Sequence, residues 1–245
     1  MSKAPFIIEN ENGKSQFIFL CDHASNFIPD EYDNLGLSEK ERLDHITWDP
    51  GSLKVSQILS KKLDAPIIHS TISRLVIDVN RRHDAKDLMP QISENTKILD
   101  NENIDENERE RRIKIYHTPY HDAISTLLDK RQKAGAEIIL IAMHSFTPIY
   151  NGVSRPWEIG FIPCQDEDFT KQLFLNIKEN NPKMNVGWNK PYAAKQGVFY
   201  TMHLHADKRK IKGSMVEIRN DEIADEAGVK KWAKIMEKSL IASLN

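Results

Sequence analysis

Short apolar runs alternate with amphipathic stretches along the chain. Continuous apolar runs are typical of buried strands, and apolar residues at three- and four-residue intervals are typical of helices. We expect strands at Gln16–Cys21, Pro66–Ser70, Arg74–Val79, Glu137–His144, Glu158–Pro163, Asn185–Trp188 and Ser214–Arg219. We expect helices at Ser38–His45, Ser52–Leu63, Glu106–Lys133, Phe169–Glu179 and Ala224–Leu244. This alternation predicts an α/β fold with a sheet between layers of helices.

Local signals refine this pattern. Ser38 and Glu41 form the sequence of a capping box, and Pro119 should kink or divide the helix that contains it. Two irregular stretches, Asp84–Asn107 and Thr147–Pro156, are long enough to form a rim or wall around a site. No repeat or linker composition divides the chain, so we expect a single domain spanning residues 1–245.

The overall composition narrows the classes of partner. The 34 basic residues nearly balance the 36 acidic ones, for a formal charge of −2, so nothing indicates a nucleic-acid partner. The two cysteines are too few for a disulfide framework, and no apolar run approaches the length of a membrane span. We expect a cytoplasmic protein that acts on a small molecule.

Polar residues follow three of the predicted strands at the point where each strand ends. His23, His144 and Glu217 each lie at or just beyond an apolar run. Ligands of open α/β sheets bind beyond the carboxyl ends of the strands, so we expect these three side chains to meet at one edge. Two imidazoles suit zinc, and a desolvated glutamate suits general-base hydrolysis. Each residue alone has a plainer interpretation: a structural histidine, or a salt-bridged glutamate.

A dense polar cluster follows the predicted strand at 74–79. Arg74, Asp78, Asn80 and Arg81 lie within eight residues of one another. Surface ion pairs are one interpretation of this cluster. Because guanidinium groups bind carboxylates through two parallel hydrogen bonds, an anchor for an acidic substrate is the alternative.

Further histidines occur at regular spacings. His117 and His121 are four residues apart, which places them on one helical face, where they suit either a metal or a hydrogen-bonded helix interface. His203 and His205 alternate on a possible strand, so at most one faces a cleft. The chain has no Gly-x-Ser-x-Gly elbow and no phosphate-binding glycine motif, so serine-nucleophile and nucleotide chemistry lack support.

Taken together, these motifs resemble the N-formylglutamate amidohydrolase family. The segments that carry the resemblance are 21–29, 45–51, 73–81, 116–121, 144–145, 197–205 and 216–221. The resemblance implies a fold like that of zinc-dependent exopeptidases, with a mixed, mostly parallel sheet and helices on both faces.

The resemblance also implies roles for individual residues. His23 and His144 correspond to metal ligands, Asn80 with Arg81 to the pair that holds a substrate carboxylate, and Glu217 to the general base. The residues that we expect to bind substrate are Arg74, Asp78, Asn80, Arg81, His121 and His205.

The ligand pattern of the exopeptidases departs from this chain at one position. A glutamate follows the first ligand by three residues in that pattern, whereas this chain has Asn26, and a neutral amide is a poor zinc ligand. Asp49 is our candidate for the missing carboxylate, followed by Asp22.

The sequence therefore favours a zinc-dependent amidohydrolase that cleaves an N-formyl or small N-acyl amide of an acidic amino acid. Two alternatives stay open: a metallopeptidase-like hydrolase of another amide, and a relative that binds a ligand without catalysis.

Overall fold

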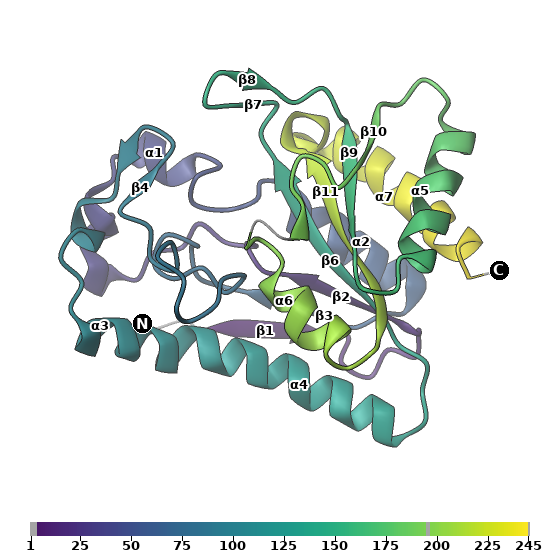
Figure 1. The fold of residues 1–245 in the computed structure, drawn as a ribbon, viewed down its shortest axis with the longest axis horizontal. Coiled ribbons are helices and arrows are strands. Elements are labelled where there is room, and N and C mark those ends of the chain that lie inside the picture. Colours follow the sequence, from purple (N-terminus) through teal and green to yellow (C-terminus); the bar gives the residue numbers. More distant parts are fainter. Residues whose placement is uncertain (1–3, 195–196, 245) are drawn as a thin grey trace.

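A seven-stranded sheet forms the centre of the structure, a computed structural model that describes residues 4–194 and 197–244 (Figure 1). The strands lie in the order β1-β3-β2-β6-β11-β9-β10. Their bounds are Phe6–Glu9 (β1), Ile67–Ser70 (β3), Phe17–Cys21 (β2), Ile139–Phe146 (β6), Lys212–Arg219 (β11), Ile159–Pro163 (β9) and Val186–Trp188 (β10). Two small hairpins lie outside this sheet, β4 (Ile92–Ser93) with β5 (Thr96–Lys97) and β7 (Ile149–Tyr150) with β8 (Val153–Ser154).

The sheet is mixed and mostly parallel. Strands β3, β2, β6 and β11 run parallel to one another, and β10 runs parallel to β9. Antiparallel pairing joins β1 to β3 and β11 to β9. The expected α/β class with a mostly parallel mixed sheet is thus confirmed, and β1 is a strand that the sequence pattern did not indicate.

Helices cover both faces of the sheet. Their bounds are Glu39–Leu43 (α1), Ser52–Leu63 (α2), Glu106–Arg112 (α3), Thr118–Lys133 (α4), Asp168–Asn180 (α5), Tyr200–Met202 (α6) and Glu226–Ala242 (α7). One face packs against α2, α5 and α7, and the other against α4 and α6. Strand β2 shows why both faces are covered: Phe17 and Phe19 enter the first core, whereas Ile18 and Leu20 enter the second.

The segment Arg74–Val79 corrects one strand prediction, because it forms turns and irregular backbone. Leu75, Val76 and Ile77 are buried in a third core together with side chains from the segments 27–46 and 85–104, whereas Val79 belongs to the second core. Leu75, Val76 and Ile77 are each at most 1% exposed. The apolar run therefore reflects burial under loops, not pairing in the sheet.

Two further predictions also need correction, one of a divided helix and one of a strand. Around Pro119 the helix neither breaks nor separates into two, because a π-helical turn at Ile113–His117 joins α3 to α4 and Pro119 lies in the first turn of α4. Figure 1 shows the result as one long helix along the edge of the molecule. The segment His203–Asp207 is a second π-helical turn and not a strand.

The capping box at Ser38 is confirmed, since the Ser38 hydroxyl accepts from the Glu41 amide and the Glu41 carboxylate accepts from the Ser38 amide. Within the described part of the chain, no helix has the length and apolar character that crossing a membrane requires.

Candidate metal centre and cleft

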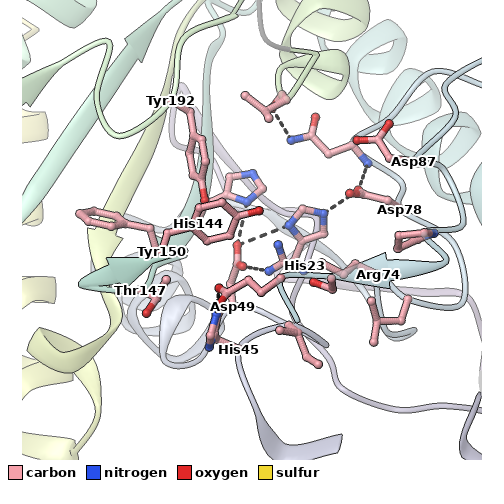
Figure 2. A pocket seen from close by; sticks show the side chains of 18 of the residues that line it. His23, His45, Asp49, Arg74, Asp78, Asp87, His144, Thr147, Tyr150 and Tyr192 are labelled. Atoms are coloured by element: carbon pink, nitrogen blue, oxygen red, sulfur yellow. Dashed lines mark hydrogen bonds and ion pairs between the residues drawn. The ribbon is translucent and has the colours of Figure 1, made fainter. Parts of the chain in front are cut away.

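The three strand-end residues meet at one edge of the sheet, as the sequence predicts. His144 lies in β6, Glu217 lies opposite it in β11, and His23 follows β2 by two residues. Because β2, β6 and β11 are adjacent and parallel, their carboxyl ends open into the same cleft of about 290 Å³. Figure 2 shows His23 and His144 side by side in this cleft, with Asp49 beside them.

Asp49 reaches the two histidines from the turn that precedes α2. Its backbone amide donates to the carbonyl of His23, and the Ser145 hydroxyl donates to the carbonyl of Pro50, so the turn is attached to both β2 and β6. Gly51 begins α2 with φ of 83°, and an added Cβ would lie 2.5 Å from the carbonyl oxygen of Ile223. The turn is therefore fixed in place, which fixes the Asp49 carboxylate.

One oxygen of Asp49 lies close to both imidazoles. Its Oδ2 is 2.8 Å from Nδ1 of His144 and 3.5 Å from Nδ1 of His23. Ligand atoms on a tetrahedral zinc lie about 3.3 Å apart, as metal distances near 2.0 Å require. Asp49, His23 and His144 each offer a ligand atom, all within 4.8 Å of one another and all buried. This set can hold a divalent metal ion.

A carboxylate lies behind each imidazole. Nε2 of His23 donates to Asp78 Oδ1 at 2.7 Å, and Nε2 of His144 lies 3.3 Å from Asp22 Oδ2. The hydroxyl of Tyr120 donates to the other oxygen of Asp22 at 2.6 Å. Carboxylates in this position keep the proton on Nε2 and leave Nδ1 free to bind a metal.

Unsatisfied polar atoms give an independent test of whether a cation fits. Nδ1 of His23 and Oε2 of Glu217 are buried and have no hydrogen-bond partner within the described residues. Buried polar groups without a partner are rare, and a bound ion is one explanation for them. The donor set, two imidazoles and a carboxylate, is one that zinc prefers.

The charges at this edge also favour a cation. Four buried carboxylates, those of Asp22, Asp49, Asp78 and Glu217, face the two histidines. Two guanidinium groups contact members of this set: Arg74 binds Oδ1 of Asp49, and Arg81 lies 3.7 Å from Asp78. The carboxylates therefore outnumber the cations that contact them.

Burial shifts the ionisation of these groups in different directions. Burial, aided by the charge of Arg74, lowers the pKa of His23 to about 4, so this imidazole is neutral at physiological pH. Burial alone would lower the pKa of His144, but the carboxylates of Asp22 and Glu217 raise it above its usual value. Burial raises the pKa of Glu217, and the charges of His144 and Arg74 offset only part of that rise.

The segment from Asp78 to Arg81 forms one wall of the cleft. The side chain of Asn80 donates to the carbonyl of Val198 and accepts from the amide of Thr201. Arg81 donates through Nε to Asp87 at 2.8 Å, and its contacts with residues that the structure describes use Nε and Nη1 but not Nη2. Asp78, Asn80, Arg81 and Arg74 all line the cleft.

Two of the expected substrate-binding residues lie outside the cleft. His121 and His205 are buried behind its wall, where Nε2 of His205 and Nδ1 of His121 are 2.9 Å apart. Direct contact with a substrate in the cleft is therefore not supported. The side-chain amide of Asn26 donates to the backbone carbonyl of Arg42 and not to either of the two histidines.

Several residues of the site escaped the sequence reasoning. Tyr120 has no sequence signal of its own, and Asp22, the second choice for the missing ligand, lies behind His144 as its partner. Arg155 is buried between the rings of Tyr150 and Tyr192, 4.4 and 4.8 Å from their centroids. Tyr150 and Tyr192 line the cleft, and no local sequence signal points to this cluster.

The two irregular stretches form the rim of the cleft, as expected. Pro90, Ile92 and Glu94 come from the first stretch, and Thr147 and Tyr150 from the second. The sheet and the residues at its edge thus define an α/β protein with a candidate divalent-metal site in a cleft.

Comparison with known families identifies the group. The family model of N-formylglutamate amidohydrolase matches residues 15–224, and the chain belongs to this family. Its members are amidohydrolases by name, so membership supports a hydrolase. A search of curated proteins found no match.

Solved structures share the fold of this chain. Gene product Atu2144 of Agrobacterium tumefaciens is 36% identical, with a TM-score of 0.95 over 99% of this chain and 95% of that one. An N-formylglutamate amidohydrolase from Ralstonia eutropha JMP134 is 16% identical, with a TM-score of 0.70 over 99% of this chain and 98% of that one. The latter likeness shows a shared fold.

The raised pKa of Glu217 predicts a pH-dependent effect of Glu217→Gln on stability in protein kept free of metal. Burial of the charged carboxylate destabilises the folded state above its folded pKa, and this cost disappears as pH falls below the usual value of 4.5. Glu217→Gln should therefore raise the urea unfolding midpoint at about pH 8 and have little effect at about pH 4.

The matched control is Glu179→Gln on the exposed face of α5, which should change the midpoint little at either pH. A lower midpoint for Glu217→Gln at about pH 8 would show that the charged carboxylate is stabilised in the fold and would contradict the assigned pKa direction.

Proposed function

We propose that this protein is a metal-dependent amidohydrolase that removes a formyl or other small acyl group from the amino group of an acidic amino acid. The observation that carries the proposal is the convergence of His23 Nδ1, His144 Nδ1 and Asp49 Oδ2 at one point, with a carboxylate behind each imidazole. Membership in the N-formylglutamate amidohydrolase family supports the reaction class.

His23, His144 and Asp49 would hold the metal ion, with zinc as the favoured ion for this donor set. When bound, such an ion supplies Lewis-acid polarisation of the amide carbonyl. Asp78, and Asp22 with Tyr120, orient the two imidazoles. The Arg74 guanidinium holds the second oxygen of Asp49, which leaves Oδ2 directed at the histidines.

Glu217 is the proposed general base. It lies opposite His144 in the sheet register, and its Oε2 is free of any described hydrogen bond. Its raised pKa makes the carboxylate a better proton acceptor than an exposed glutamate. Glu217 takes a proton from the attacking water and delivers it to the leaving nitrogen, so the acyl group leaves as a carboxylic acid and the amine is released.

The arginines support an acidic substrate. Arg81 lies on the cleft wall beside Asp78, and its side chain is 18% exposed. A guanidinium in this position can bind a substrate carboxylate through two parallel hydrogen bonds. Arg74 contacts the Asp49 carboxylate of the candidate metal set, whereas the ion-pair partners of Arg81, Asp78 and Asp87, lie outside that set, so Arg81 is the stronger candidate for the carboxylate anchor.

The metal assignment predicts the effect of removing one ligand. His23→Ala and His144→Ala should each abolish stoichiometric zinc binding and leave the far-UV circular dichroism unchanged, because a buried two-residue remnant binds zinc poorly. Asp78→Asn keeps all three ligands and changes the group behind His23, which also contacts Arg81, so it should weaken zinc binding by about 10–100-fold.

His69→Ala is the control, because His69 is also buried but lies on β3 and contacts Glu9. It should keep its zinc. Full zinc retention by both His23→Ala and His144→Ala would refute this ligand set; metal content is measured by plasma mass spectrometry after dialysis.

Glu217→Gln tests the general base. The change keeps the volume of the side chain and removes the proton acceptor, so kcat should fall by about 10²–10⁴-fold. KM and zinc content should change little, since Glu217 is not a proposed ligand. Steady-state kinetics with N-formylglutamate decide the matter: a kcat within a few-fold of the parent would remove Glu217 from the mechanism.

A further inference from the structure

Four histidines form two hydrogen-bonded pairs behind the cleft wall. Nε2 of His83 and Nδ1 of His117 are 2.9 Å apart, as are Nε2 of His205 and Nδ1 of His121. The rings of His117 and His121 are 4.5 Å apart between centroids, so the pairs adjoin each other. None of the four lines the cleft or belongs to the candidate metal site.

Each pair ends on a backbone carbonyl of the cleft wall. Nε2 of His117 donates to the carbonyl of Arg81 at 2.9 Å, and Nε2 of His121 donates to the carbonyl of Val79 at 2.8 Å. These carbonyls flank Asn80, whose side chain is held by Val198 and Thr201. The backbone here belongs to no helix or strand, so its buried carbonyls depend on such side-chain donors.

The hydrogen bonds determine the tautomers. A carbonyl only accepts, so His117 and His121 carry their proton on Nε2 and accept at Nδ1 when neutral. His83 and His205 must then donate from Nε2. His117 and His205 are nearly or fully buried, and burial lowers the pKa of His117, His121 and His205 to about 3 in each case, so all three are neutral at physiological pH.

We propose that His117 and His121 are positioning residues that fix the Val79–Arg81 segment so that the Arg81 guanidinium meets the substrate carboxylate, with His83 and His205 setting their tautomers. The inference rests on the proposed function, because it requires Arg81 to be the anchor. It assigns the histidines to substrate affinity and not to the chemical step.

Two π-helical turns hold His117 and His205. His117 is the last residue of the π-helical turn at Ile113–His117, and His205 lies in the π-helical turn at His203–Asp207. An extra residue in a helical turn rotates the side chains that follow it, and such turns recur at functional sites. Ordinary helical spacing would direct these side chains elsewhere.

The test replaces each histidine by phenylalanine and by glutamine. Phenylalanine keeps an aromatic side chain but has no N–H, which leaves a buried carbonyl unpaired. Glutamine retains a side-chain N–H that can donate to the same carbonyl. With N-formylglutamate as substrate, His117→Phe and His121→Phe should raise KM about tenfold and change kcat by less than about threefold. The glutamine variants should return KM to within about threefold of the parent.

A double-mutant cycle separates positioning from a general structural effect. Arg81→Lys should raise KM by itself, and adding His117→Phe to it should change KM little further, because His117 acts through Arg81. His203→Phe is the control. His203 is half exposed on the same turn as His205 and contacts Asp207 instead of the cleft wall, so KM should be unchanged.

Each outcome has one meaning. Phenylalanine variants with parental KM, a loss confined to kcat, or full additivity with Arg81→Lys would overturn the positioning role alone. If Arg81→Lys has parental KM, or if the parent neither binds nor hydrolyses N-formylglutamate, the proposed acidic-substrate anchor fails first and this inference falls with it. Should the buried variants not fold, His83→Phe at an exposed position decides, with an expected rise in KM of about threefold.

Discussion

The Asp49 carboxylate is the group on which the rest of the site depends. Its Oδ2 lies within 3.5 Å of one nitrogen of each strand-end histidine, and its Oδ1 binds Arg74. Buried carboxylates are costly unless each oxygen has a partner, and here every partner is itself held by the fold. Without Asp49 the two imidazoles would lose the carboxylate that completes the candidate ligand set, and Arg74 would lose a buried partner.

The sheet topology brings these groups together, and the second layer of polar contacts gives each of them a role. Adjacent parallel strands place His144 between Asp22 and Glu217, so one carboxylate can orient the imidazole and another can accept protons. Buried imidazoles also hold the cleft wall in place, because His117 and His121 donate hydrogen bonds to the backbone carbonyls on either side of Asn80. Hydrogen bonds thus connect the site to the helices and turns around it.

Much of the fold and part of the site were predictable from sequence, for reasons visible in particular residues. Strands β2, β6 and β11 are long apolar runs with polar ends, so His23, His144 and Glu217 could be placed at one edge. The strand prediction for Arg74–Val79 was wrong because the surrounding segments bury Leu75 and Ile77 as completely as a sheet would. The π-helical turn that contains His205 could not be predicted because such a turn has no sequence period of its own. The role of Tyr120 could not be predicted because its partner Asp22 is 98 residues away in the sequence.

Metal content of the unaltered protein tests the central claim most directly. Protein purified without chelator, then loaded with zinc and dialysed, should hold one ion per chain, lose hydrolysis of N-formylglutamate on chelation, and regain it when zinc is restored. If the zinc-loaded protein binds no ion, or hydrolyses the amide equally well after complete chelation, the account of a metal-dependent amidohydrolase is wrong.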